Sequence, residues 1–133
     1  MKKEKKKKRI KREPQPAAIL QTAEAGEAKV DSADSLLQYA LTVVGGKWKI
    51  RILWALRDGA SLRYGEIKQK IPAITDMMLS QSLRELTADA LIARQQYQQI
   101  PPKVEYRITP AGAELIPTVE LLNAWAAKNR KGD

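Results

Sequence analysis

The segment from Thr75 to Ala88 carries side chains whose chemistry suits the edges of nucleic-acid bases. If it is a helix, with about 100° between successive residues, its leucines share one narrow sector: Leu79, Leu83 and Leu86. The opposite sector contains Met77, Gln81, Arg84 and Ala88. A glutamine can form two hydrogen bonds to adenine, and an arginine can form two to guanine. The spacing therefore predicts a helix that is buried on its leucine side and has hydrogen-bonding groups on the other.

Base contacts would be expected near the start of this helix, because a recognition helix usually makes them with its first turns. Thr75 is a suitable N-cap, and Ile74 and Leu79 stand where a hydrophobic staple would form. The base-reading candidates are Thr75, Asp76, Met77, Ser80, Gln81 and Arg84. An ordinary solvated helix face would also be polar, so this helix alone leaves that alternative open.

Two alternating runs, LIARQQY and KVEYRIT, follow this helix and predict a β-hairpin with QQIPP at its tip. Cations on its strands and uncharged amides near its tip suit contacts to phosphate or the minor groove, although an ordinary soluble hairpin would look similar. Lysines at the start of an earlier helix could also meet phosphate, or could serve solubility alone. The phosphate-contact candidates are Lys47, Lys49, Arg63, Arg94, Lys103 and Arg107.

Capping residues, glycines and prolines divide the rest of the chain into short elements. Helices are expected from Ser32 or Asp34 to Val44, over 47–57, over 64–71, and from Pro110 to about residue 126. Residues 61–63 are expected to form a small strand, and Pro117 is expected to bend the last helix. Three helices with a two-stranded wing after the third predict a mainly α winged helix-turn-helix, with further helices at both ends.

Positive charge is concentrated at the start of the chain. Residues 1–13 carry nine Lys or Arg and two Glu, a net charge of +7, whereas the whole 133-residue chain has a net charge of only +9. Residues 1–30 are expected to be a disordered basic tail and linker, and residues 31–128 a single folded domain. Such a tail suits nucleic-acid binding, but a mere solubility extension would look the same.

The chain contains neither Cys nor His. It therefore has no disulfide or thiol chemistry, and it lacks the commonest general base and the commonest zinc ligand. With no phosphate-binding glycine loop and no usefully spaced carboxylate pair, we expect no enzyme, no metal site and no cofactor. No run approaches the ~20 apolar residues of a membrane span, and no apolar run follows the basic start. We expect no membrane partner and a cytoplasmic, nucleoid-associated location.

Four segments, in order and at matching spacing, resemble one known family. They are VVGGKWKIRILWALRDG, LRYGEIKQKIPAIT, MMLSQSLRELTADALI and YQQIPPKVEYRITPAG, which are similar to the HxlR-type winged helix-turn-helix transcriptional regulators, related to the MarR group. The likeness runs from about Ser35 to Trp125. It implies a bacterial regulator that binds double-stranded DNA sequence-specifically.

The resemblance also implies a homodimer on a palindromic operator, since the first and last helices of two such subunits pack together. The interface candidates that it supplies are Leu36, Leu37, Leu41, Leu115, Val119, Leu122 and Trp125. Some of them could instead close the core of a single chain.

Several positions depart from the family's pattern. Ser35 stands where many members have a Cys, and with no Cys anywhere in the chain thiol sensing is excluded. Met77 and Ser82 replace basic residues, so fewer phosphate contacts are expected from this helix, and we expect the basic tail to compensate along the DNA backbone. Ala90 replaces a Gly, which predicts a strained or rearranged turn, and Tyr64 replaces a Phe and adds a hydroxyl.

A different class of function stays open, namely an RNA- or ribosome-associated basic protein that uses the winged helix as a scaffold. A stable dimer on a palindromic duplex would favour the regulator, and binding to single-copy RNA would favour the alternative. A small-molecule effector is compatible with the pattern, with Tyr39, Trp48, Trp54 and Trp125 as pocket candidates. Aromatic residues at helical spacing are more often core residues, and no ligand is predicted.

Overall fold

The computed structural model describes residues 32–132, so the basic tail expected at residues 1–30 lies outside the described residues. Contacts divide the chain into two compact units, Met1–Thr42 and Val43–Asp133. This division falls after Thr42, whereas the sequence places the start of the folded domain at residue 31. Helix α2 (Ala33–Val44) supplies most of what is described of the first unit.

Ser32 caps the start of helix α2, as expected. The backbone N–H of Ser35 donates to Ser32 Oγ at 3.1 Å, which satisfies one of the free donors at the helix start. Within the described part of the chain no α2 residue is buried, and Leu37 and Leu41 are 56% and 57% exposed. Helix α2 therefore carries apolar surface that the described residues do not cover.

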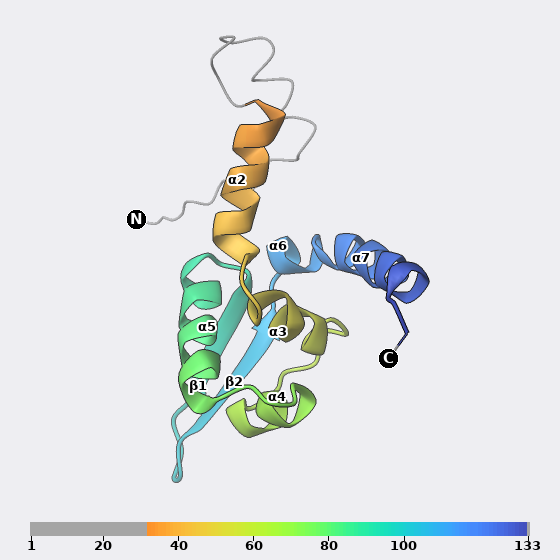
Figure 1. Ribbon diagram of the computed structural model, residues 1–133. Coiled ribbons are helices and arrows are strands. Elements are labelled where there is room, and N and C mark those ends of the chain that lie inside the picture. The colour runs from red at the N-terminus through yellow and green to blue at the C-terminus, as the bar shows by residue number, and fades with distance from the viewer. Residues whose placement is uncertain (1–31, 133) are drawn as a thin grey trace. The chain divides into compact units, whose positions relative to one another are not determined.

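The second unit is a winged helix-turn-helix. Its elements are α3 (Lys49–Ala55), α4 (Tyr64–Lys70), α5 (Asp76–Ala88), β1 (Ile92–Tyr97), β2 (Lys103–Ile108), α6 (Pro110–Ala113) and α7 (Ile116–Asn129). Helix α3 lies between α5 and α7 and contacts both, as well as α4 (Figure 1). The mainly α fold with an antiparallel wing, predicted from the sequence, is confirmed.

The core of this unit forms where α3, α4 and α5 meet the start of the wing. It consists of Ile52, Leu53, Leu56, Ile67, Ile71, Ile74, Leu79, Leu83, Leu86, Leu91 and Ile92. Complete burial of such a side chain is worth about 1.5–3 kcal/mol. The three buried leucines of α5 therefore fix the rotation of this helix about its axis, and with it the residues that face outward.

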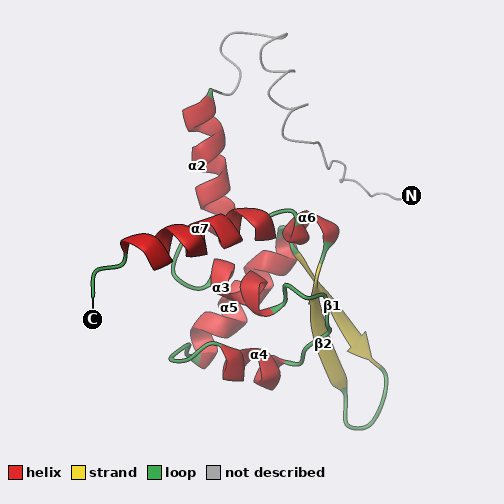
Figure 2. Cartoon of the chain, turned by 90° about the vertical axis from the view of Figure 1, so that its right-hand side faces the viewer, coloured by secondary structure: helices red, strands yellow, loops and turns green. Residues whose placement is uncertain are grey.

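The wing is an antiparallel hairpin that extends away from the helices, with residues 98–102 at its far end (Figure 2). Its register places Ile92 opposite Ile108 and Tyr97 opposite Lys103. Leu62 forms a single bridge to Tyr106 of β2, with backbone hydrogen bonds of 2.9 and 2.8 Å. The small strand expected at residues 61–63 is thus one bridging residue, which ties the segment before α4 to the wing.

The C-terminal helix differs from the expected one. Helix α6 ends at Ala113 and α7 begins at Ile116, so the break lies at residues 114–115 rather than at Pro117. Pro117 occupies the first turn of α7, where no helical hydrogen bond depends on its missing N–H. The prediction of a bend at Pro117 was wrong for this reason.

The end of α5 is the strained turn that the sequence predicts at Ala90, which has a φ of 62°. The backbone N–H of Leu91 donates to the carbonyl of Leu86, and that of Ala90 donates to Thr87, both at 3.0 Å. These two bonds form a Schellman motif, whose left-handed position usually holds glycine. The Thr109 hydroxyl donates to the Ala90 carbonyl at 2.7 Å and helps to hold this turn.

Candidate nucleic-acid interface

The outward face of α5 has the composition predicted from its helical spacing. Met77 is 73% exposed, and Gln81, Arg84 and Ala88 are exposed as well. Ser82 is only 7% exposed and lies on the core side of the helix. The Ser82 side chain itself thus faces the core, and the loss of a phosphate contact at this position stays a prediction.

The first turn of α5 is held by side chains from α4. Thr75 caps the helix by accepting a 3.1 Å hydrogen bond from the backbone N–H of Met78, as predicted. The hydroxyl of Tyr64 donates to Asp76 Oδ1 at 2.9 Å and lies 3.4 Å from Ser80 Oγ. Lys68 Nζ also lies 2.9 Å from Asp76 Oδ1. The hydroxyl that distinguishes Tyr64 from phenylalanine thus joins the two helices of the motif.

These contacts change the ionisation of the Asp76 carboxyl. The hydrogen bond from Lys68, followed by that from Tyr64, holds the pKa of Asp76 below its usual value. Asp76 therefore stays a carboxylate even in mildly acidic solution, with a cation beside it. Because Oδ1 of its carboxylate already binds two side chains of α4, the structure favours a positioning role for Asp76 beside the base-reading role predicted from the sequence.

Lys49 of α3 contacts α5 and the backbone of Val43, the first residue of the second unit. Its ammonium lies 2.9 Å from Glu85 Oε1 and donates to the carbonyl of Val43 at 3.2 Å, with the side chain only 13% exposed. Gln81 Nε2 donates to the other carboxylate oxygen, Glu85 Oε2, at 3.0 Å. The hydrogen bonds from Gln81 and Lys49 lower the pKa of Glu85. The lysine expected to face phosphate thus has internal partners.

Only part of this network has a signal in the sequence. Gln81 and Glu85 are four residues apart in a helix, a spacing at which side chains commonly meet. Lys49 reaches Glu85 from another helix, and no local pattern predicts that contact. The residue types of Lys49 and Gln81 mark each of them as a candidate in the sequence, whereas no sequence signal of this kind marks Glu85, which connects them.

The cations of the wing lie on different faces of the hairpin. Opposite residues in an antiparallel pair share a face, so Arg94 shares one with Tyr106, while Arg107 shares the other with Ala93. Both arginines are exposed. Lys103 lies over the Tyr97 ring, 4.5 Å from its centroid, so this cation is held against the hairpin.

The two remaining phosphate candidates are exposed and lie before α3 and α4. Lys47 lies over the Trp48 ring, 5.1 Å from its centroid, just ahead of α3. Arg63 precedes the first residue of α4, and its backbone N–H donates to Glu66 at 2.7 Å. Neither side chain is joined to the outer face of α5 by a hydrogen bond or ion pair among the described residues.

The interface residues expected on the last helix separate into two groups. Val119 is 4% exposed within the single chain, which corrects its assignment: it is a core residue. Leu115 is half-buried and packs against the core. Leu122 and Trp125 are 53% and 63% exposed. Leu121, which the sequence analysis did not select, is 71% exposed and lies one helical turn before Trp125.

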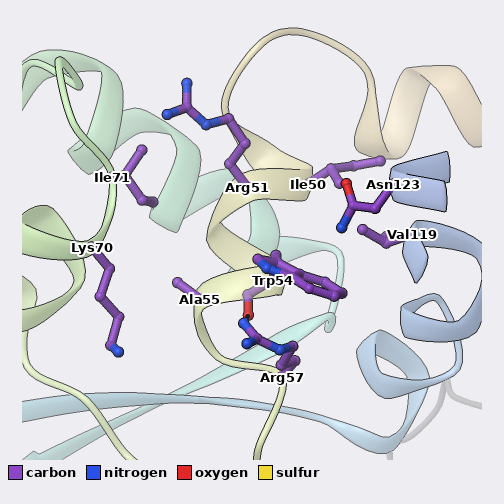
Figure 3. A pocket seen from close by; sticks show the side chains of 9 residues that line it. All are labelled: Ile50, Arg51, Trp54, Ala55, Arg57, Lys70, Ile71, Val119 and Asn123. Carbon is purple, nitrogen blue, oxygen red and sulfur yellow. Dashed lines mark hydrogen bonds between the residues drawn. The ribbon is translucent and has the colours of Figure 1, made fainter. Parts of the chain in front are cut away.

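A cavity of about 370 Å³ lies on the side of α3 that faces α7. Trp54, Ile71 and Val119 line it, and the cations around it are Arg51, Arg57 and Lys70 (Figure 3). The charged ends of these cations lie apart, and the Arg57 guanidinium lies against the Trp54 ring, 4.1 Å from its centroid. The cavity thus has no convergent set of polar groups. Of the predicted pocket aromatics, it contains Trp54 alone.

Two other kinds of site are absent from the described residues. No group of acidic side chains among residues 32–132 could hold a metal ion. None of the helices in that range has the length and apolar character needed to cross a membrane.

The fold defines a winged helix-turn-helix protein. In it, α5 is the second helix of the motif and has one exposed face. The family model described as HxlR-like helix-turn-helix matches residues 43–133. The chain belongs to this family, and the resemblance found in its sequence is confirmed.

Relatives with regulatory names support this assignment. MalR of Fusobacterium mortiferum, provisionally named a regulatory protein, is 47% identical over 93 residues, which are 70% of this chain and 88% of that protein. An HTH-type transcriptional regulator of Halalkalibacterium halodurans is 42% identical over 97 residues, 73% of this chain and 86% of the relative. The family and these relatives are transcriptional regulators and not enzymes.

A solved structure is similar over most of the chain. The redox regulator HypR in its oxidised form has a TM-score of 0.67 and 39% identity, and the match covers 73% of this chain and 99% of that one. HypR is named for redox regulation, whereas this chain contains no cysteine. A thiol switch is therefore not available to the chain.

Proposed function

We propose that the protein binds double-stranded DNA sequence-specifically as a homodimer and regulates transcription from a palindromic operator. Family membership supports the general activity, and the outer face of α5 is the observation that carries the specific proposal. Gln81 and Arg84 are exposed there on a helix whose opposite face is fixed in the core. Residues of these types read adenine and guanine in the major groove. The protein would act in the cytoplasm, at the nucleoid.

The wing and the helix starts would supply contacts to the DNA backbone. Arg94 and Arg107 are exposed on opposite faces of the hairpin, so in one docked orientation they would meet different parts of the duplex. Lys47 and Arg63 are exposed near the first turns of α3 and α4. Contacts to phosphate position a protein on DNA, and contacts to base edges choose the sequence. We assign the first role to these four residues and the second to Gln81 and Arg84.

Exposed apolar residues on both terminal helices support the homodimer. Leu37 and Leu41 of α2 and Leu122 and Trp125 of α7 are each more than half exposed in the single chain. Large apolar side chains grouped on a helix face commonly mark an interface. Two-fold symmetry would place two copies of α5 on half-sites about one helical turn apart, roughly 34 Å.

Selection of bound duplexes from a random pool tests this proposal. We expect an enriched inverted repeat whose half-sites are separated by about one turn of DNA. A parallel selection from random RNA provides the comparison. Enrichment of a single-copy RNA motif, with none from the duplex pool, would contradict the proposal and support the RNA-associated alternative.

A further inference from the structure

We propose that Glu85 and Lys49 are positioning residues that set the base preference of Gln81, and that Lys49 is not a phosphate contact. This inference rests on the proposed function, since it concerns how the same reading face obtains its specificity. It is supported by the hydrogen-bonded series Val43–Lys49–Glu85–Gln81. Within this series, one carboxylate oxygen of Glu85 contacts Lys49 and the other contacts Gln81.

Glu85 determines which end of the Gln81 amide faces outward. A carboxylate can only accept hydrogen bonds, so the neighbouring amide must turn its nitrogen toward Glu85. Gln81 Nε2 donates one hydrogen to Glu85 Oε2 at 3.0 Å. One N–H and the carbonyl oxygen of the amide remain for a ligand. Adenine presents an acceptor at N7 and a donor at N6 in the major groove, which are the complements of these two groups.

Lys49 fixes the carboxylate that holds Gln81. Its ammonium lies 2.9 Å from Glu85 Oε1, and the Lys49 side chain is 13% exposed, compared with 43% for that of Glu85. Its second partner is the Val43 carbonyl in the last turn of α2, where helical carbonyls have no partner within the helix. A lysine that is largely covered and already has two acceptors is poorly placed to neutralise a DNA phosphate.

The arrangement reduces the entropy lost on binding. A free glutamine side chain loses rotational entropy when it is fixed, and both amide orientations are open to it. In this protein, that ordering occurs before DNA is bound. Gln81 should therefore discriminate between bases more sharply than an unsupported glutamine on a helix surface.

The first test measures Gln81 in the free protein. We expect ¹⁵N relaxation to show an ordered Gln81 side-chain amide in the wild type and a mobile one in Glu85→Gln and Lys49→Met. Glu114→Gln makes the same chemical change at an exposed residue of the second unit, outside this network, and should leave the amide ordered. An amide that is already mobile in the wild type would overturn the inference, whatever the protein binds.

The second test measures base preference, using the duplex selected by the wild type and its variants with each base at each position. Glu85→Gln leaves a neighbour that can both donate and accept, so both Gln81 orientations become available. We expect the adenine preference at one position of each half-site to fall roughly 3- to 10-fold. Lys49→Met should act at the same position and more weakly, with an unchanged salt dependence. The double variant should resemble Glu85→Gln.

The outcomes separate the possible failures. If the wild type selects no duplex, the proposed function is wrong. The relaxation experiment still shows whether Glu85 and Lys49 hold the Gln81 amide in place. If Lys49→Met weakens binding to every duplex equally and reduces the salt slope by about one, Lys49 is a phosphate contact and the inference is wrong. A base profile of Glu85→Gln identical to that of Glu114→Gln would overturn it as well.

Discussion

Asp76 shows how a single residue at the start of α5 can serve the fold. Its carboxylate lies in the first turn of α5, where the helix dipole favours a negative charge. Lys68 and the Tyr64 hydroxyl both reach it from α4. The sequence predicted a helix start here, since the Thr75 cap has a local signature. It could not predict the partners of Asp76, because they depend on how two helices meet.

The low pKa of Asp76 makes a prediction about stability and pH. Because its folded pKa lies below the ordinary value of an aspartate, ionised Asp76 stabilises the fold above about pH 4, and this contribution is lost as the pH falls through the folded pKa. Tyr64→Phe should therefore lower the urea midpoint at pH 7, and the difference from wild type should shrink below pH 4. Tyr39→Phe, on the exposed part of α2, is the control. A difference that is independent of pH would contradict this account of Asp76.

At the scale of elements, regular patterns were predictable and their junctions were not. The buried and exposed faces of α5 follow from leucine spacing, and the hairpin follows from alternation in KVEYRI. The break at residues 114–115 has no comparable signal, since Pro117 suggests a bend at another place. The break depends on tertiary packing, because α6 contacts β2 whereas α7 contacts α3. The same limit applies to the candidate site: the outer face was predictable, and the Lys49–Glu85 contact was not.

The turn that ends α5 offers a stabilising substitution. Ala90 has a φ of 62°, and left-handed backbone costs a residue with a side chain roughly 1–2 kcal/mol relative to glycine. Ala90→Gly should therefore raise the free energy of unfolding by about 1 kcal/mol, as measured by urea denaturation. Ala88→Gly, at the last helical residue of α5, should instead destabilise by roughly 0.5–1 kcal/mol. Loss of stability in both variants would show that the turn is not strained.

At the scale of the whole molecule, the apolar surfaces of the terminal helices predict an assembly. Trp125 is 63% exposed on α7, and Trp125→Glu would place a charge in the proposed interface. We expect sedimentation to show a dimer for the wild type and a monomer for this variant at micromolar concentration. Gln69→Glu adds the same charge at an exposed residue of α4 and should stay dimeric. A dimeric Trp125→Glu would place the interface elsewhere.

The basic tail, which lies outside the described residues, is proposed to strengthen binding without choosing the sequence. Residues 2–13 carry nine cations, and each phosphate they neutralise steepens the dependence of affinity on salt. Deleting them should flatten the slope of log affinity against log salt, while preference for the selected duplex over random DNA largely survives. Collapse of that preference would mean that the tail itself reads sequence. An unchanged slope would favour a solubility extension.

The central claim, that the outer face of α5 reads DNA, is tested most directly by the base-preference profile of Arg84→Ala. Arg84 is exposed and has no ion-pair partner among the described residues, so its loss should leave the fold intact. We predict that the profile loses discrimination at one guanine in each half-site, by about 1–3 kcal/mol, and keeps its other positions. The control, Arg57→Ala, removes an exposed arginine beside the α3 cavity and should keep the full profile. A complete wild-type profile from Arg84→Ala would contradict the account.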